Sequence, residues 1–152
     1  MADTQQEQEG DQNFEKRYPY VYSVIVTLLS IIICSVFGNS PKLSNEVLEC
    51  GITVGSIFVG FNAIYRNTLQ ISNNKTVESL KNSGYMQLYQ GYLKAVLNCS
   101  LLFIFTSFIL LFIHEDNRQN ILIFNVWLFP AVLMLLCFYR ANSLDSRLYF
   151  SR

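Results

Sequence analysis

Four long stretches of this chain contain no Asp, Glu, Lys or Arg, and this feature constrains the fold more than any other. They cover residues 18–38, 50–65, 95–113 and 119–139. A membrane core about 30 Å thick is crossed by about 20 mainly apolar residues of helix. Three of the stretches are long enough alone, and the second becomes so when Val47 to Glu49 is added. The sequence therefore predicts an all-α membrane protein, a bundle of four transmembrane helices.

Turn-forming and polar segments set the limits of the predicted spans. We expect the spans at about residues 20–37, 47–65, 92–113 and 121–139. A cluster of turn-forming residues, Gly38 to Pro41, follows the first span. Residues 1–13 are polar and acidic and have almost nothing to bury, so we expect a disordered tail there. The rest, residues 14–152, is expected to form a single four-helix domain.

The composition agrees with a membrane protein and excludes one class of function. Of the 152 residues, 51% are hydrophobic and 14% are charged, whereas soluble proteins average about 25% charged residues. The formal net charge is zero, so no basic surface indicates direct binding of nucleic acid. We expect the lipid bilayer to be the main partner of the chain.

The positions of Lys and Arg predict how the chain crosses the membrane. The N-terminal tail, the middle polar segment with its flanks and the C-terminal tail contain most of them, whereas the two other links contain only Lys42 and Arg118. Segments rich in Lys and Arg stay in the cytoplasm. We therefore expect a multi-pass protein of a bacterial inner membrane, with the N- and C-termini in the cytoplasm.

The longest polar segment, Arg66 to Gln90, lies between the second and third spans. Its apolar residues recur near helical spacing, which predicts a cytoplasmic juxtamembrane helix that runs into the third span. The alternative is a plain extension of the two spans into the cytosol. Three tyrosines form a second series that we expect to be exposed and to bind a cytosolic effector protein. They are Tyr85, Tyr89 and Tyr92.

Small residues mark one side of the second span. Gly51 and Gly55 form a GxxxG pair, and Ser56 and Gly60 form a second pair at the same spacing. Small residues let membrane helices approach one another closely. The four positions predict a contact in a homo-oligomer or a pore-lining face, and packing inside one four-helix bundle is the alternative.

Polar residues inside the spans predict where helices meet. The second, third and fourth spans carry Asn62, Asn98 and Asn125. An amide in hydrocarbon needs partners, so all three are expected to face the bundle interior, as links between helices or around a wet constriction. The first span has a weakly polar stripe, which either lines a wet path or bonds back to its own helix. The stripe consists of Ser23, Thr27, Ser30 and Cys34.

No constellation of catalytic, cofactor-binding or metal-ligating residues is present. No carboxylate lies deep in a predicted span, and the only histidine, His114, has no second ligand candidate. Neither a glycine-rich phosphate loop nor an HExxH motif occurs. The cysteines have no paired spacing and are interpreted as small packing residues. They are Cys34, Cys50, Cys99 and Cys137. We expect no enzymatic activity, no cofactor and no metal.

The region from Gly51 to Ile113 resembles small four-span membrane proteins of bacterial phage defence. It combines a small-residue helix, a basic cytoplasmic segment, the tripeptide Gly84-Tyr85-Met86 and a long apolar helix. This plan is similar to that of the lambda Rex membrane protein type and of CRISPR-accessory or Kiwa-type membrane subunits. The resemblance implies an antiviral role, with ion-channel activity in the Rex type.

Two hypotheses of function follow from the sequence. The first is an oligomeric inner-membrane protein that perturbs membrane permeability or potential as a phage-defence effector. Because four helices of one chain enclose no aqueous channel, its pore would form between copies. The alternative is a non-conducting membrane anchor or sensor subunit that binds a cytosolic effector through residues 66–90.

Overall fold

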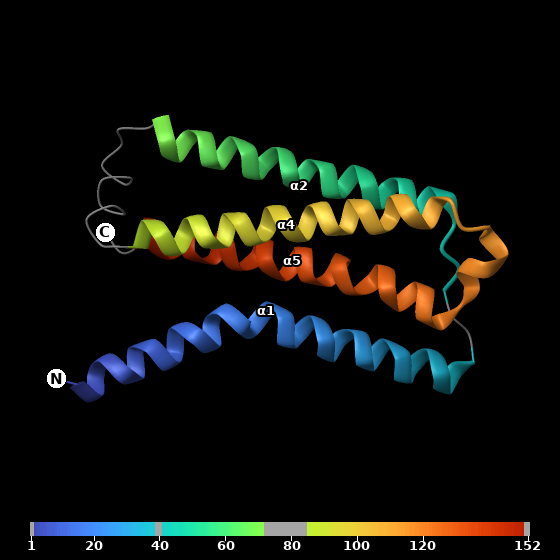
Figure 1. The fold of residues 1–152 in the computed structure, drawn as a ribbon, viewed down its shortest axis with the longest axis horizontal. Helices are drawn as coiled ribbons and strands as arrows, with labels where there is room; N and C mark the ends of the chain where they lie inside the picture. The colour runs from blue at the N-terminus through green and yellow to red at the C-terminus, as the bar shows by residue number, and fades with distance from the viewer. Residues whose placement is uncertain (1, 39–40, 72–84, 151–152) are drawn as a thin grey trace.

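The computed structural model describes residues 2–38, 41–71 and 85–150, and side chains within 17–38, 41–67 and 89–143. All regular structure in these ranges is helical. The elements are α1 (Ala2–Phe37), α2 (Asn45–Ile71), α4 (Tyr85–Leu111), the short 3-10 helix η1 (Glu115–Gln119) and α5 (Ile121–Phe150) (Figure 1).

Each of the four α-helices contains a segment long and apolar enough to cross a membrane. The segments are Arg17–Phe37, Asn45–Asn67, Tyr89–Leu111 and Ile121–Ser143, of 21 to 23 residues each. At the helical rise per residue they are about 32 to 35 Å long, which matches the hydrocarbon thickness of a bilayer. For the described residues, the prediction of an all-helical protein with four membrane-compatible helices is confirmed.

The helices contact one another mainly in the order α2, α4, α5, α1 (Figure 1). The start of α1 and the end of α5 lie at the same end of the bundle as the end of α2 and the start of α4. The α1–α2 link and η1 lie at the opposite end. We call the first of these the inner end and the second the outer end. The helix ends that flank the segments rich in Lys and Arg thus lie at one end, and the cytoplasmic location of those segments stays a prediction.

The first helix is longer than predicted and is bent. Pro19 lies inside α1, which changes direction near its middle (Figure 1). Proline has no backbone N–H and crowds the preceding turn, so a bend is expected there. Helix α1 begins at Ala2, and the disorder expected for residues 1–13 stays a prediction.

The cytoplasmic juxtamembrane helix is not found in the described part of the chain. Residues 66–71 continue α2, and residues 85–90 form the start of α4. In these positions the chain follows the alternative of extended spans. Residues 72–84, where the rest of the predicted helix falls, lie outside the described residues.

The core lies between α2, α4 and α5. Phe58 of α2 meets Phe138 of α5 edge-on, with ring centroids 4.5 Å apart. Nearer the outer end, the rings of Phe103 and Trp127 lie 5.5 Å apart, and the Trp127 indole donates to the Ser107 hydroxyl at 2.9 Å. Lipid removes the hydrophobic drive between helices, so such close packing holds them together.

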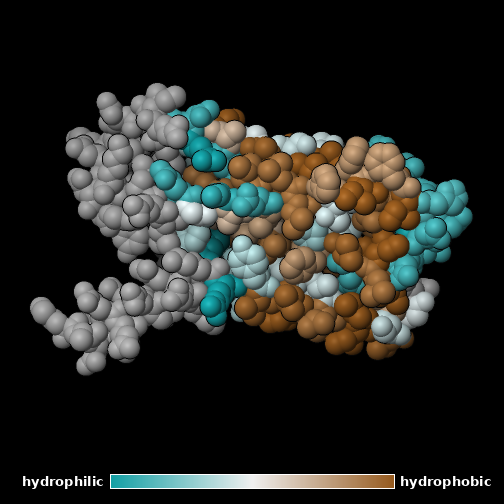
Figure 2. All heavy atoms as spheres, viewed as in Figure 1, coloured by the Kyte–Doolittle hydropathy of each residue, from teal (hydrophilic) through white to brown (hydrophobic). Residues whose placement is uncertain are grey.

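The remaining helix, α1, packs mainly against α5. Its buried face carries Ser23, whose hydroxyl donates to the Pro19 carbonyl at 2.7 Å, and Thr27, whose hydroxyl donates to the Ser23 carbonyl at 2.8 Å. For these two residues the interpretation of back-bonded hydroxyls is confirmed. The other faces of α1 carry exposed apolar side chains. They contribute to the apolar band between hydrophilic ends that Figure 2 shows.

Candidate functional site

The first glycine pair of α2 lies inside the bundle. Gly51 and Gly55 are both buried. A β-carbon on Gly55 would lie 2.6 Å from Cγ1 of Ile104, and one on Gly51 would lie 3.1 Å from Phe103 and from Ser107. The missing side chains therefore let the α2 backbone approach α4. These two positions pack within a single chain, as the alternative interpretation of the pattern expected.

The second small-residue pair lies on the outer surface of α2. Ser56 and Gly60 are exposed, and nothing lies within 4 Å of a β-carbon placed on Gly60. The Ser56 hydroxyl donates to the Ile52 carbonyl at 2.8 Å, so its hydrogen-bonding need is met inside the helix. This half of the predicted oligomer contact is the half that a second copy can reach.

The three asparagines differ in their surroundings. Asn62 and Asn125 are buried, as predicted. Asn98 is exposed, so the expected inward orientation does not hold for it. On α4 it follows the exposed residues Gly91 and Lys94 at helical spacing, on the side away from the core. Sequence shows only that an amide is present in an apolar span, and the helix face decides where it points.

The two buried amides make different contacts. The Asn62 amide donates to the Leu93 carbonyl of α4 at 2.5 Å and so links two helices. The Asn125 amide donates to the Ile121 carbonyl of its own helix at 2.7 Å. Among the described residues, the Oδ1 atom of each asparagine is buried with no hydrogen-bond partner. Asn62 lines a cavity of about 10 Å³ at the inner end, close to the smallest space that holds one water.

The exposed amide of Asn98 lies deep in the apolar part of α4. It is nine residues beyond Tyr89, where the apolar segment begins, which is about 14 Å along the helix axis. No described residue forms a hydrogen bond with its side chain. An amide in hydrocarbon without a partner costs several kcal/mol, roughly 2–7. The position therefore favours a partner from outside this chain.

Two of the three tyrosines that were expected to be exposed are part of the core at the inner end. Tyr89 and Tyr92 are buried, and the side chain of Tyr85 lies outside the described part. Arg140 of α5 donates to the Tyr92 hydroxyl at 2.7 Å, and its guanidinium carbon lies 4.3 Å from the ring centroid. Tyr92 therefore holds α4 against α5 through its ring and hydroxyl, and binding of a cytosolic effector by the tyrosines stays a prediction.

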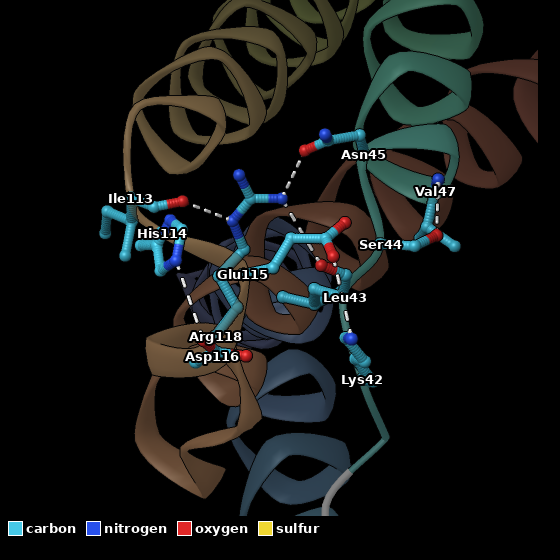
Figure 3. Close-up of polar contacts among 10 residues, drawn as sticks. All are labelled: Lys42, Leu43, Ser44, Asn45, Val47, Ile113, His114, Glu115, Asp116 and Arg118. Carbon is cyan, nitrogen blue, oxygen red and sulfur yellow. Dashed lines mark hydrogen bonds and ion pairs between the residues drawn. The ribbon is translucent and has the colours of Figure 1, made fainter.

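At the outer end, Arg118 of η1 is buried, with 2% of its surface exposed. Figure 3 shows its guanidinium group between Ile113, Leu43 and Asn45. Its Nε atom donates to the Ile113 carbonyl at 2.7 Å, and Nη2 donates to the Leu111 carbonyl at 3.0 Å. Nη1 donates to the Leu43 carbonyl at 3.4 Å and to Oδ1 of Asn45 at 2.6 Å. We call this set of contacts the outer cap.

The outer cap balances a buried charge without a carboxylate. No Asp or Glu of the described ranges forms an ion pair with Arg118. The carbonyl of Leu111 is at the end of α4, where carbonyls lack helical partners and the helix dipole is negative, and the carbonyl of Ile113 lies two residues beyond it. A second link, the ion pair of Lys42 with Glu115 at 3.6 Å, joins the same two loops. In the sequence, Arg118 served only as one of two basic residues in the links that were expected outside the cytoplasm.

Two cysteines that are far apart in sequence meet between α4 and α5. The Sγ atoms of Cys99 and Cys137 lie 3.7 Å apart, and the residues are 5% and 4% exposed. Cys34 is also buried, whereas Cys50 is exposed. Where the chain is described, no group of three or more His, Cys, Asp or Glu is placed to hold a metal ion.

No protein-family model, curated protein or solved structure matches this chain. Its candidate sites are therefore defined by its own geometry. The buried glycines, the Tyr92–Arg140 contact and the outer cap each join parts of one chain. Asn98 alone among the predicted asparagines presents its polar group to the surroundings, and it is the candidate for contact with another molecule.

Proposed function

We propose that this chain is a multi-pass protein of a bacterial inner membrane that self-associates and perturbs membrane permeability. Both termini are in the cytoplasm, and phage defence, suggested by the resemblance, is its setting. The observation that carries the proposal is the exposed amide of Asn98 in the apolar segment of α4. A polar group in this place is satisfied most simply by the same group of a second copy.

Symmetry supports a contact between two copies at Asn98. Two chains in one membrane with the same orientation can be related by a two-fold axis along the membrane normal. Such an axis beside α4 brings the two Asn98 amides together at equal depth. Each amide can then donate one hydrogen bond and accept another. Hydrogen bonds between membrane helices contribute about 0.6 to 2 kcal/mol each.

The packing of one chain supports a water path that lies between copies of the chain and not inside one copy. Phe103, Trp127 and Met134 fill the described core, and the cavity beside Asn62 has room for about one water. The face of α4 that carries Asn98 also carries Gly91 and Lys94, both exposed. These three residues extend from the inner end of the apolar segment toward its middle. In an oligomer they would give water and ions a polar route into the membrane.

Replacing Asn98 with leucine removes both hydrogen bonds of the symmetric pair, so it is expected to weaken self-association by about 7- to 700-fold, which corresponds to about 1.2 to 4 kcal/mol. Energy transfer between labelled copies in liposomes measures the association constant. Asn67→Leu is the matched control, because Asn67 is also exposed but lies at the end of the apolar segment of α2. The control is expected to associate as the unchanged chain does. Equal association of both variants would contradict the contact at Asn98.

Two further measurements distinguish the proposed contact and function from their alternatives. Gly60→Leu tests the exposed small-residue face of α2, and loss of association in that variant alone would move the contact from α4 to α2. A voltage-sensitive dye in cells tests the permeability step. Phage protection without depolarisation would contradict a permeability effector and favour a membrane anchor that binds a cytosolic effector through residues 66–90.

A further inference from the structure

The contact between Cys99 and Cys137 places two thiols at a distance from which a bond can form. Their sulfur atoms are 3.7 Å apart, and a disulfide is about 2.05 Å long. Closure requires the sulfurs to approach by about 1.7 Å in total. The two residues lie on neighbouring helices of the bundle core, so such a bond would join α4 to α5 within one chain.

The position of the pair determines which oxidants can reach it. Cys99 is ten residues inside the apolar segment of α4 from Tyr89, and Cys137 is six residues inside that of α5 from Ser143. Apolar neighbours such as Val96 and Leu133 surround the pair. A charged oxidant dissolved in water, such as glutathione disulfide, is excluded from hydrocarbon by its solvation. The solvation of a quinone does not exclude it from the bilayer in which the helices lie.

The apolar surroundings also favour an oxidant that removes protons together with electrons. A thiol in such surroundings stays protonated, because a thiolate there loses its solvation. A quinone accepts two electrons and two protons to become a quinol. It can therefore accept the two electrons and two protons that a pair of protonated thiols loses when a disulfide forms.

We propose that Cys99 and Cys137 are a dithiol site that a lipid-soluble quinone oxidises to an intramolecular disulfide. Two S–H bonds break and one S–S bond forms, so the sulfurs together lose two electrons. The two electrons and two protons pass to the carbonyl oxygens of the quinone, which becomes the quinol. This inference does not depend on the proposed function, because it requires only one folded chain in a bilayer.

The test uses a chain in which the pair is the only source of thiols. Cys34→Ser and Cys50→Ser together leave Cys99 and Cys137 in place, and a control chain carries Cys137→Ser in addition. Both are placed in liposomes with decylubiquinone, whose ring is fully substituted and cannot add to a thiol. After denaturation, thiols are counted with a maleimide. We expect the chain that keeps Cys99 and Cys137 to lose both thiols while it stays monomeric. We expect the control chain to keep its single thiol.

A parallel measurement on the unchanged chain gives a result that does not depend on whether the variants fold. Mass spectrometry of a non-reduced digest is expected to show the peptides of Cys99 and Cys137 joined, with the mass of two hydrogens missing. Retention of both thiols in excess quinone would overturn the proposal, and so would a disulfide formed only between chains. Equal oxidation by glutathione disulfide added to the water would overturn the selection for a lipid-soluble oxidant.

Discussion

Replacement of Arg118 with methionine is expected to lower the free energy of unfolding by about 3 kcal/mol or more. The substitution keeps an unbranched chain of similar length but removes every donor of the outer cap. The carbonyls of Leu43, Leu111 and Ile113 then lose a charge-assisted partner inside the protein, and each buried unpaired group costs about 1 to 3 kcal/mol. Unfolding by heat in detergent micelles, followed by circular dichroism, measures the loss.

Two further variants show whether geometry or charge matters in the outer cap. Arg118→Lys keeps the charge but has three donors on one nitrogen, which cannot reach acceptors spread around a planar guanidinium. It is expected to lose most of the same stability. Lys42→Met removes the exposed ion pair with Glu115 and is expected to cost less than about 1 kcal/mol. If Arg118→Met lowers the free energy of unfolding no more than Lys42→Met does, the outer cap does not stabilise the fold.

The second large effect is expected from leucine at Gly55. A β-carbon there would already lie 2.6 Å from Ile104 Cγ1, and leucine adds three more carbon atoms in the same direction. Either the side chain of Ile104 leaves its place or α2 moves away from α4. Overpacking of this kind costs about 1 to 3 kcal/mol, occasionally more. The same unfolding measurement is expected to show a loss at the upper end of this range.

The matched substitution is Gly60→Leu, on the same helix but with open space around the new side chain. It makes the same chemical change and is expected to leave stability unchanged or to raise it by up to about 1 kcal/mol through helix propensity. Equal stability of the two variants would show that α2 and α4 are not in close contact at Gly55. The comparison also means that Gly55→Leu tests packing within the chain, whereas Gly60→Leu tests contact between copies.

The sequence predicted the four spans because absence of charge over about 20 residues is a one-dimensional property. It did not predict which face of a helix meets a neighbour. Asn62 and Asn98 are both single amides in apolar segments, yet one is buried against Leu93 and the other is exposed. The rotation of α4 around its axis decides this, and that rotation depends on packing with two other helices.

The sequence also did not predict contacts between residues that are far apart along the chain. Cys99 and Cys137 are 38 residues apart, and no local spacing marks them as a pair. In the sequence, Arg118 looks like any charged residue of a polar loop. Its burial depends on carbonyls supplied by three segments. The GxxxG pattern did indicate close approach of helices, but the partner of Gly55 was α4 of the same chain.

The unequal attachment of α1 has a consequence for the order in which the molecule comes apart. The core joins α2, α4 and α5, and the Asn62 link further joins α2 to α4, whereas α1 packs mainly along one side of α5. The hydroxyls of Ser23 and Thr27 on that side bond within α1 itself. A force applied to the N-terminus in a bicelle is therefore expected to peel α1 away first, at low force. The three remaining helices should then separate as one later event.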